Sequence, residues 1–160
     1  MLSSTRPLRS RLLGCGPLAH RRRLPTSTAG TSAGTVLLGL SSSSAFGPAS
    51  TAILRARVFD SPTGRAFLES CPHHCIPLSH YGAEVYGPIQ ATLPVTRPQP
   101  LIPPGGLAYS QAGGFLCVFF GQDPAWDVDY IGQIDEGWEE LRFTSWTSLS
   151  VLIARAASSD

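Results

Sequence analysis

The segment Cys71–Cys75 (CPHHC), followed by His80, brings together residue types that bind metal ions. Cysteine and histidine are the usual ligands of zinc, and a tetrahedral site needs four of them to converge. The spacing argues against convergence, because Pro72 ends a helical segment and Cys75 begins a strand, so that neighbouring side chains diverge. A disulfide within the segment would require the two Cα atoms to lie within about 7 Å. We therefore expect no metal, no cofactor and a structural role for this segment.

Carboxylate and aromatic side chains form a second candidate group. Glu84 and Tyr86 are two apart on a predicted strand, so they share one face. A carboxylate near phenol groups can bind a polar ligand or act as a general base. The alternative is an exposed Glu beside aromatic residues of the core. We assign no catalytic residue and predict an aromatic ligand-binding groove formed by Glu84, Tyr86, Tyr109, Phe119 and Trp126.

The strand that must position this groove is the apolar run Phe115–Phe120. It lies within the glycine-rich stretch Gly105–Asp135, with glycines at positions 113, 114 and 121. Six residues make fewer than two helical turns, and the flanking glycines oppose helix propagation. The run therefore predicts a strand that is buried on both faces.

Other elements are predicted on either side of this strand. Ala52–Phe59 favours a strand, and Ser61 followed by Pro62 is typical of a helix start, with the helix ending at Cys71. Five prolines within Pro94–Pro104 exclude both helix and central strand. In total the sequence predicts a mainly β protein: a closed barrel of about seven or eight strands with one main helix, spanning residues 51–160.

Residues 1–50 differ in composition from the rest of the chain. They are rich in Arg, Ser and Thr and contain no Asp or Glu, as in many transit peptides. We predict a disordered leader that directs the protein to a mitochondrion or plastid; without such a signal the cytoplasm is expected. Arg21–Arg23 is alternatively a nuclear-import or nucleic-acid patch. Within this range, Thr35–Leu40 is an alternative first strand.

The charge of the predicted barrel bears on its partners. Residues 51–160 carry all eleven acidic residues and six of the twelve Arg. Phosphate neutralisation supplies much of the affinity for nucleic acids, so we expect no nucleic acid to bind through the barrel. No apolar stretch approaches the roughly 20 residues of a membrane span, which predicts a soluble chain with no membrane contact. A small molecule or a peptide is the expected partner, and the oligomeric state stays open.

Several motifs, taken in order, resemble those of cyclophilins. They are similar above all to a family of small cyclophilin-like barrel proteins, mostly prokaryotic and of uncharacterised activity. The resemblance extends from Ile53 to Val151 and implies a cyclophilin-like β-barrel. The motifs are Ser61–Leu68 (SPTGRAFL), Tyr81–Tyr86 (YGAEVY), Pro104–Tyr109 (PGGLAY), Phe119–Gly121 (FFG) and Ile131–Ile134 (IGQI).

Two departures from the cyclophilin pattern bear on activity. Cyclophilins carry a catalytic Arg in a Phe-His-Arg-like motif, whereas the corresponding stretch Glu84–Pro88 has none. Their Gln-Phe-Phe triplet is replaced by Gly114–Leu116. An apolar pocket without its Arg lacks a large electrostatic contribution to catalysis. We therefore predict a binding module rather than a prolyl isomerase; the alternative is a prolyl isomerase or another enzyme that uses Glu84 or Arg97.

Overall fold

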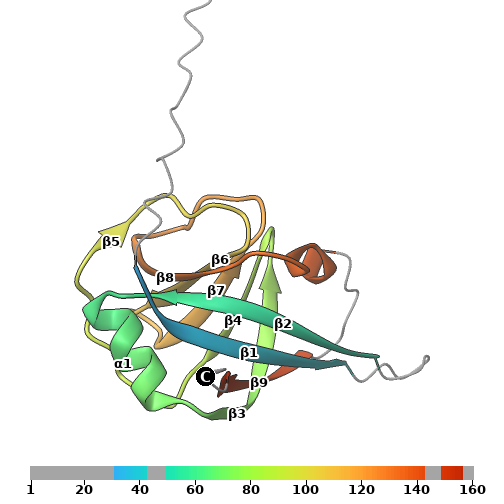
Figure 1. Ribbon diagram of the computed structural model, residues 1–160. Coiled ribbons are helices and arrows are strands. Elements are labelled where there is room, and N and C mark those ends of the chain that lie inside the picture. The colour runs from blue at the N-terminus through green and yellow to red at the C-terminus, as the bar shows by residue number, and fades with distance from the viewer. Residues whose placement is uncertain (1–30, 43–49, 143–148, 157–160) are drawn as a thin grey trace, which may run out of the picture.

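The computed structural model describes residues 31–42, 50–142 and 149–156. Within these residues the chain forms nine β-strands, one α-helix and one 3-10 helix (Figure 1). In chain order they are β1 (Ser32–Ser42), β2 (Ser50–Phe59), α1 (Pro62–Ser70), β3 (His73–Tyr81), β4 (Glu84–Pro88), β5 (Pro98–Gln99), β6 (Gly106–Ser110), β7 (Phe115–Phe119), β8 (Val128–Ile134), the 3-10 helix η1 (Trp138–Arg142) and β9 (Leu149–Arg155). No helix in this part of the chain is long and apolar enough to cross a membrane.

Eight of these strands close into an antiparallel barrel. The order around the ring is β2-β1-β9-β3-β4-β7-β6-β8, and the pairing of β2 with β8 completes it. The two-residue strand β5 lies outside the ring, on β8, where Pro98 pairs with Asp129. Closure pairs the strand edges with one another, which is how all-β folds avoid exposed edges. The predicted closed barrel of about seven or eight strands with one main helix is thus confirmed.

The barrel begins earlier than the sequence predicts. Strand β1 lies within residues 1–50, the range assigned to a leader, and it pairs with both β2 and β9. Its side chains Val36, Leu38 and Leu40 are at most 3% exposed and belong to the core. The boundary at residue 51 is therefore wrong, and the alternative strand over Thr35–Leu40 is confirmed. Small and polar residues on both sides of this short apolar run make the segment resemble a linker.

The rest of the predicted leader, residues 1–30 and 43–49, lies outside the described residues. The prediction of a disordered, organelle-directing leader therefore stays a prediction.

Alternate residues of each strand point into and out of the barrel, and both faces of β7 are covered. Leu116 and Val118 belong to the main core inside the barrel. Cys117 and Phe119 belong to a second, smaller cluster on the outside, where Ile102 and Val128 pack against them. The prediction that Phe115–Phe120 is buried on both faces is thus confirmed. The second cluster supports the outer surface of β4, β6 and β7.

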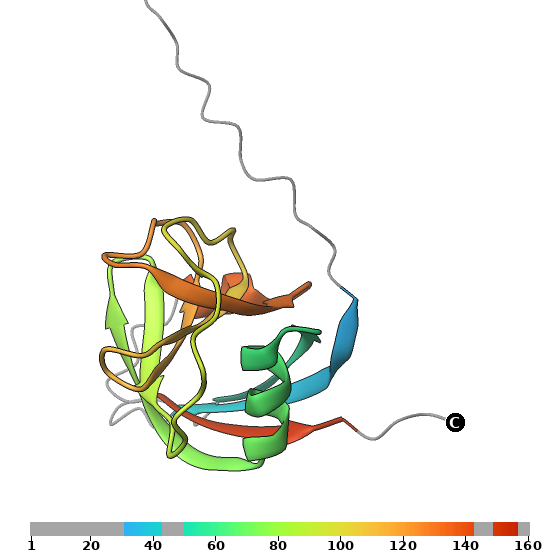
Figure 2. The same ribbon diagram turned by 90° about the vertical axis from the view of Figure 1, so that its left-hand side faces the viewer.

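Helix α1 has the boundaries that its sequence predicts. Ser61 is the N-cap, its side chain accepts a hydrogen bond from Gly64 N at 3.0 Å, and Pro62 is the first helical residue. The helix ends at Ser70, before the Cys71–Pro72 bond. It packs against β1, β2 and β8 and inserts Phe67, which is fully buried, into the main core. Figure 2 shows the helix with β8 (orange) on one side and β9 (red) on the other.

Candidate functional site

The strands β4, β7 and β6 lie side by side and bring most of the predicted groove residues to one surface. In the register of β4 with β7, Glu84 pairs with Phe119 and Tyr86 with Cys117. These positions alternate with residues such as Val85 that enter the main core. The side chains of Glu84, Tyr86 and Phe119 therefore lie on the outside of the barrel. We call the surface formed by Glu84, Tyr86, Ser110, Phe115, Phe119 and Trp126 the outer face.

Trp126 joins the outer face from the loop between β7 and β8. Its indole N–H donates a hydrogen bond to the hydroxyl of Ser110 at 2.8 Å. Ser110 is fully buried and pairs with Phe115 across β6 and β7. Trp126 as a whole nevertheless stays 54% exposed. The hydrogen bond therefore holds a large aromatic side chain in place while leaving much of it open to solvent.

The other aromatic residues of the outer face lie on β4 and β7. Tyr86 and Phe115 contact each other edge to face, with ring centroids 5.2 Å apart. Both are partly buried and pack on the second cluster. Phe119, by contrast, is only 1% exposed, so it supports the surface from below. Phe119 thus lies on the same face as Glu84 and Tyr86, but its ring is not available for direct contact with a ligand.

Tyr109 does not lie on this face. It neighbours Ser110 on β6, so it points in the opposite direction, into the barrel. The structure places it in the main core at 1% exposure, and its hydroxyl accepts a 3.4 Å hydrogen bond from Leu93 N. The prediction that Tyr109 lines a groove with the other four residues is therefore wrong. Side chains alternate between the two faces of β6, so those of adjacent residues point in opposite directions. The alternation does not show which of the two points into the barrel.

Glu84 lies at the end of the outer face opposite Trp126. It is 8% exposed, and this burial raises the pKa of its carboxyl group, while a hydrogen bond with the Gln122 side chain acts in the opposite direction. Gln122 is itself held by the backbone, since Ala83 N donates to its Oε1 at 2.7 Å. The result is a nearly buried carboxyl group with a fixed amide partner, which suits a polar contact with a ligand.

Cys117 is the thiol nearest to this carboxyl group, and it is not suited to nucleophilic chemistry. It pairs with Tyr86 and is 4% exposed. Burial, together with the negative charge of Glu84, raises the pKa of the thiol to about 12. Because the thiolate is the nucleophilic form, Cys117 acts as a small core residue.

Arg97, the alternative catalytic cation, lies away from Phe119. Its backbone N–H donates to Asp129 Oδ2 at 3.3 Å, next to the short pairing of β5 with β8. Phe119 of β7 pairs with Gly106 of β6, and Gly106 pairs on its other side with Gln133 of β8. Gln133 is four residues beyond Asp129 on β8. Four residues of strand span about 13 Å, and β6 and β7 add further spacings of about 4.8 Å each. The two backbones are thus separated by more than the length of an arginine side chain.

The side chains of the Cys71–Cys75 segment are not gathered as a set of metal ligands. No group of three or more His, Cys, Asp or Glu residues suitable for a metal ion occurs in the part of the chain that is described. Cys71 and Cys75 are free thiols. His73 is 7% exposed, stacks on Phe67 with ring centroids 5.8 Å apart, and its Nε2 lies 2.9 Å from Ser70 Oγ. These contacts join β3 to the end of α1, which is a structural role.

The buried position of His73 leads to a prediction about pH. Burial, with a smaller contribution from the positive charge of His74, lowers the pKa of His73. An unfolded chain has a histidine pKa of about 6.5. Between this value and the lower folded pKa, the unfolded state binds more protons, so the free energy of unfolding falls as pH drops below about 6.5.

Urea denaturation at neutral and mildly acidic pH measures this effect, and His73→Gln is expected to reduce the loss of stability on acidification. His74→Gln is the control, because His74 is exposed and burial is the larger cause of the shift. An equal loss of stability in wild type and His73→Gln would contradict the prediction.

Sequence reasoning missed three residues of this site. Phe115 has a signal, because it shares the alternation of Cys117 and Phe119 along β7. Ser110 and Gln122 have none, since their roles depend on contacts with Trp126 and with Ala83 that only the folded chain creates.

Comparisons with known proteins agree on the fold. The model of a family described as Cyclophilin-like matches residues 48–151. Among solved structures, the chain is similar to the solution structure of the hypothetical protein AF2241 from Archaeoglobus fulgidus, with a TM-score of 0.57 and 22% sequence identity over 81% of this chain and 99% of that one. At this identity the similarity concerns the fold alone. No curated protein sequence matches.

Proposed function

The chain belongs to the Cyclophilin-like family, and on that premise we propose that it is a binding protein that takes a peptide or small ligand on its outer face. One observation carries the proposal: Trp126 is 54% exposed although its indole N–H is bound to the buried Ser110. Tryptophan is enriched in the centres of binding sites, and it combines a large apolar surface with one polar group.

The arrangement of the outer face indicates the chemistry of the ligand. Trp126, Phe115 and Tyr86 supply apolar contact surface at one end. At the other end Glu84 supplies a carboxyl group that accepts hydrogen bonds when ionised. Along β7 the two ends are four residues apart, or about 13 Å. A ligand that spans them combines an apolar or aromatic group with a hydrogen-bond donor, as an extended peptide of about four residues does.

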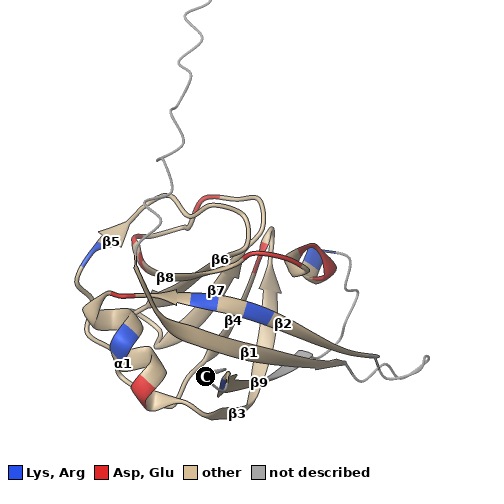
Figure 3. Cartoon of the chain, in the orientation of Figure 1, with Lys and Arg blue, Asp and Glu red and all other residues tan. Residues whose placement is uncertain are grey.

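The distribution of charge supports the choice of a peptide or small molecule over nucleic acid. Figure 3 shows Arg (blue) and acidic residues (red) interspersed over the described fold, with no stripe of one sign. A nucleic-acid interface depends on a concentrated basic surface. Prolyl isomerisation also receives no support, because β4, β6 and β7 contain no Arg and Arg97 lies away from Phe119.

A screen of end-blocked tetrapeptides tests the proposal. The peptides carry an aromatic or aliphatic residue and a residue with a donor side chain at varied spacing. We expect thermal-shift hits to combine both residue types, since a ligand that binds only the native state stabilises it. Calorimetry on the hits is expected to show that Trp126→Ala weakens binding by about 10-fold or more, as for a central aromatic contact.

Ile53→Ala is the matched control, because Ile53 is another exposed apolar residue, at 74%, on a different strand. It is expected to leave the affinity within about two-fold of wild type. Hits whose affinity is the same in wild type and Trp126→Ala would show that the ligand binds elsewhere and would refute the proposed site.

A further inference from the structure

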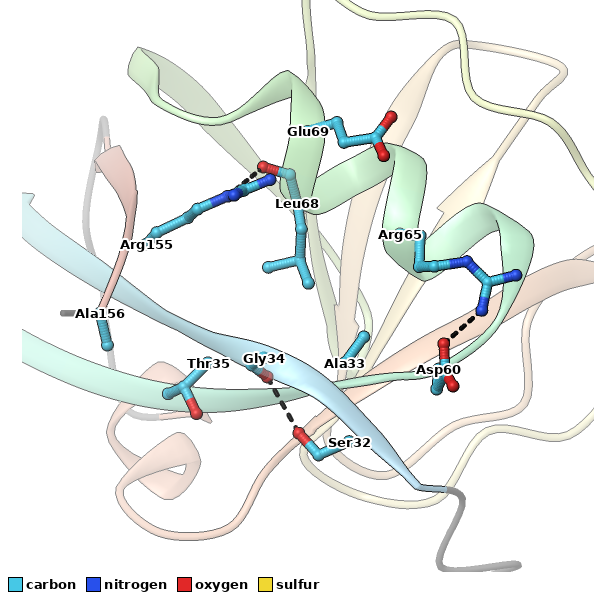
Figure 4. A pocket seen from close by; sticks show the side chains of 10 residues that line it. All are labelled: Ser32, Ala33, Gly34, Thr35, Asp60, Arg65, Leu68, Glu69, Arg155 and Ala156. Carbon is cyan, nitrogen blue, oxygen red and sulfur yellow. Dashed lines mark hydrogen bonds and ion pairs between the residues drawn. The ribbon is translucent and has the colours of Figure 1, made fainter. Parts of the chain in front are cut away.

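A separate cleft of about 390 Å³ lies beside helix α1, away from the outer face. Figure 4 shows the residues around it: the first part of β1, the exposed side of α1 and the last residues of β9. Cavities that hold small molecules have volumes of roughly 300–1,000 Å³. This cleft is thus large enough for a ligand of the size of an amino acid or a dipeptide.

The cleft exists because β9 ends before β1 does. The last register pair between them is Val36 with Arg155, and Ala156 N then donates to Thr35 O at 2.9 Å. Among the described residues, no strand pairs with the same edge of β1 over Ser32–Gly34. Helix α1 borders the space instead, and Gly34 permits the approach, since a Cβ atom there would lie 3.1 Å from Leu68 Cδ1. The site thus has a backbone edge on one side and a helix on the other.

Arg155 places a fixed guanidinium group in this cleft. Its Nε donates a 2.6 Å hydrogen bond to Leu68 O, near the C-terminus of α1 (Figure 4). That bond uses one of five N–H donors, and the two terminal nitrogens have no acceptor among the described residues. Two parallel N–H groups match the two oxygens of a carboxylate. Arg155 is therefore held at the cleft by one donor and keeps further donors that can bind a carboxylate.

Glu69 supplies the opposite charge. It follows Leu68 on α1 and is exposed, and no ion pair with it occurs in the part of the chain that is described. Arg65, the other arginine of the cleft, is paired with Asp60 at its far end (Figure 4). The four charges of the cleft therefore sum to zero. A phosphate or a dicarboxylate would bring further negative charge close to Glu69 with no positive group to neutralise it. A ligand with one positive and one negative group would instead pair with both Glu69 and Arg155.

We propose that this cleft binds a small zwitterion, a free amino acid or a dipeptide, with its carboxylate on Arg155 and its ammonium group on Glu69. Leu68, Ala33 and Ala156 offer limited apolar surface, which favours a short aliphatic side chain. This site is independent of the outer face and would give the protein a second ligand of a different class.

NMR titration of the full chain at low ionic strength tests the proposal with four probes. L-Alanine and L-alanyl-L-alanine carry both charges, N-acetyl-L-alanine only the carboxylate, and L-alaninamide only the ammonium group. We expect saturable shifts of the amide signals of Ser32–Thr35 and Ala156, with a zwitterion bound at least about 10-fold more tightly than either single-charge probe. Whichever of the two zwitterions binds more tightly shows whether the ligand is a free amino acid or a dipeptide.

Variants separate the two contacts. Arg155→Gln is expected to weaken binding of alanine and N-acetyl-alanine alike by about 10-fold or more, and Glu69→Gln to weaken only alanine and alaninamide. Arg142→Gln and Glu140→Gln, exposed residues of η1, are the matched controls and are expected to change nothing. If Arg155→Gln fails to fold, the selective effect of Glu69→Gln decides the question, because its side chain is exposed.

Three results would overturn the proposal. One is the absence of saturable shifts with all four probes at their solubility limits. Another is tighter binding of inorganic phosphate than of either zwitterion. The third is equal affinity of wild type and Glu69→Gln for every probe. The Trp126→Ala variant, which tests the outer face, is expected to bind the zwitterion normally, so failure at one site is distinguishable from failure at the other.

Discussion

Replacing Tyr109 with alanine is expected to lower the free energy of unfolding by about 4 kcal/mol, because large-to-small substitutions of buried aromatic residues remove packing and leave a cavity. The side chain is 1% exposed and lies in the main core. Its hydroxyl contributes less, since the single hydrogen bond from Leu93 N is long at 3.4 Å. Tyr109→Phe is therefore expected to cost about 1 kcal/mol or less.

Urea denaturation followed by circular dichroism measures both values. Tyr81→Ala is the control, because Tyr81 is 62% exposed and its removal is expected to change stability by no more than about 0.5 kcal/mol. A stable Tyr109→Ala variant that loses ligand binding would mean that Tyr109 contacts ligand after all and that its placement inside the barrel is wrong.

Replacing Asp129 with alanine is expected to lower the free energy of unfolding by about 3 kcal/mol, since it removes a buried acceptor and leaves its donors without a partner. Asp129 is 2% exposed. Its Oδ2 accepts hydrogen bonds from Thr63 Oγ1 at 2.6 Å, from Thr96 N at 2.7 Å and from Arg97 N at 3.3 Å. One carboxyl group thus joins β8, helix α1 and the proline-rich loop.

Thermal and urea denaturation measure this loss, and Asp127→Ala is the matched control. Asp127 lies two residues away and is exposed, so its removal is expected to be nearly neutral. Equal stability of the two variants would contradict the role assigned to the carboxyl group of Asp129. A second consequence is that loosening the loop in Asp129→Ala should increase amide hydrogen exchange at Thr96 and Arg97, whose N–H groups lose their acceptor.

Local sequence rules were sufficient for several elements. Helix α1 begins and ends where Ser61, Pro62 and Cys71 predict, because capping and proline chemistry act within one turn. The run Phe115–Phe120 is a strand because its length and flanking glycines exclude a helix. The same rules gave β1 only as an alternative strand, because its stability comes from pairing with two strands, of which β9 is distant in sequence.

The candidate site was only partly predictable for a related reason. Alternation places Glu84 and Tyr86 on one face of β4, and that prediction is correct. Alternation alone does not say whether a face points into the barrel or out of it. Tyr109 and Ser110 show the consequence, since the polar-looking tyrosine lies in the core and the serine binds Trp126 on the outside.

The amino-acid sequence by itself therefore determines a mainly β fold with one short helix. It also contains the motifs that indicate the family. Closure of the barrel decides the rest: which face of each strand is buried, how Trp126 is held, and that Arg155 meets Leu68 although 87 residues separate them. The physical reason is that propensities and caps act over a few residues, whereas register and closure depend on contacts between segments that only the folded chain brings together.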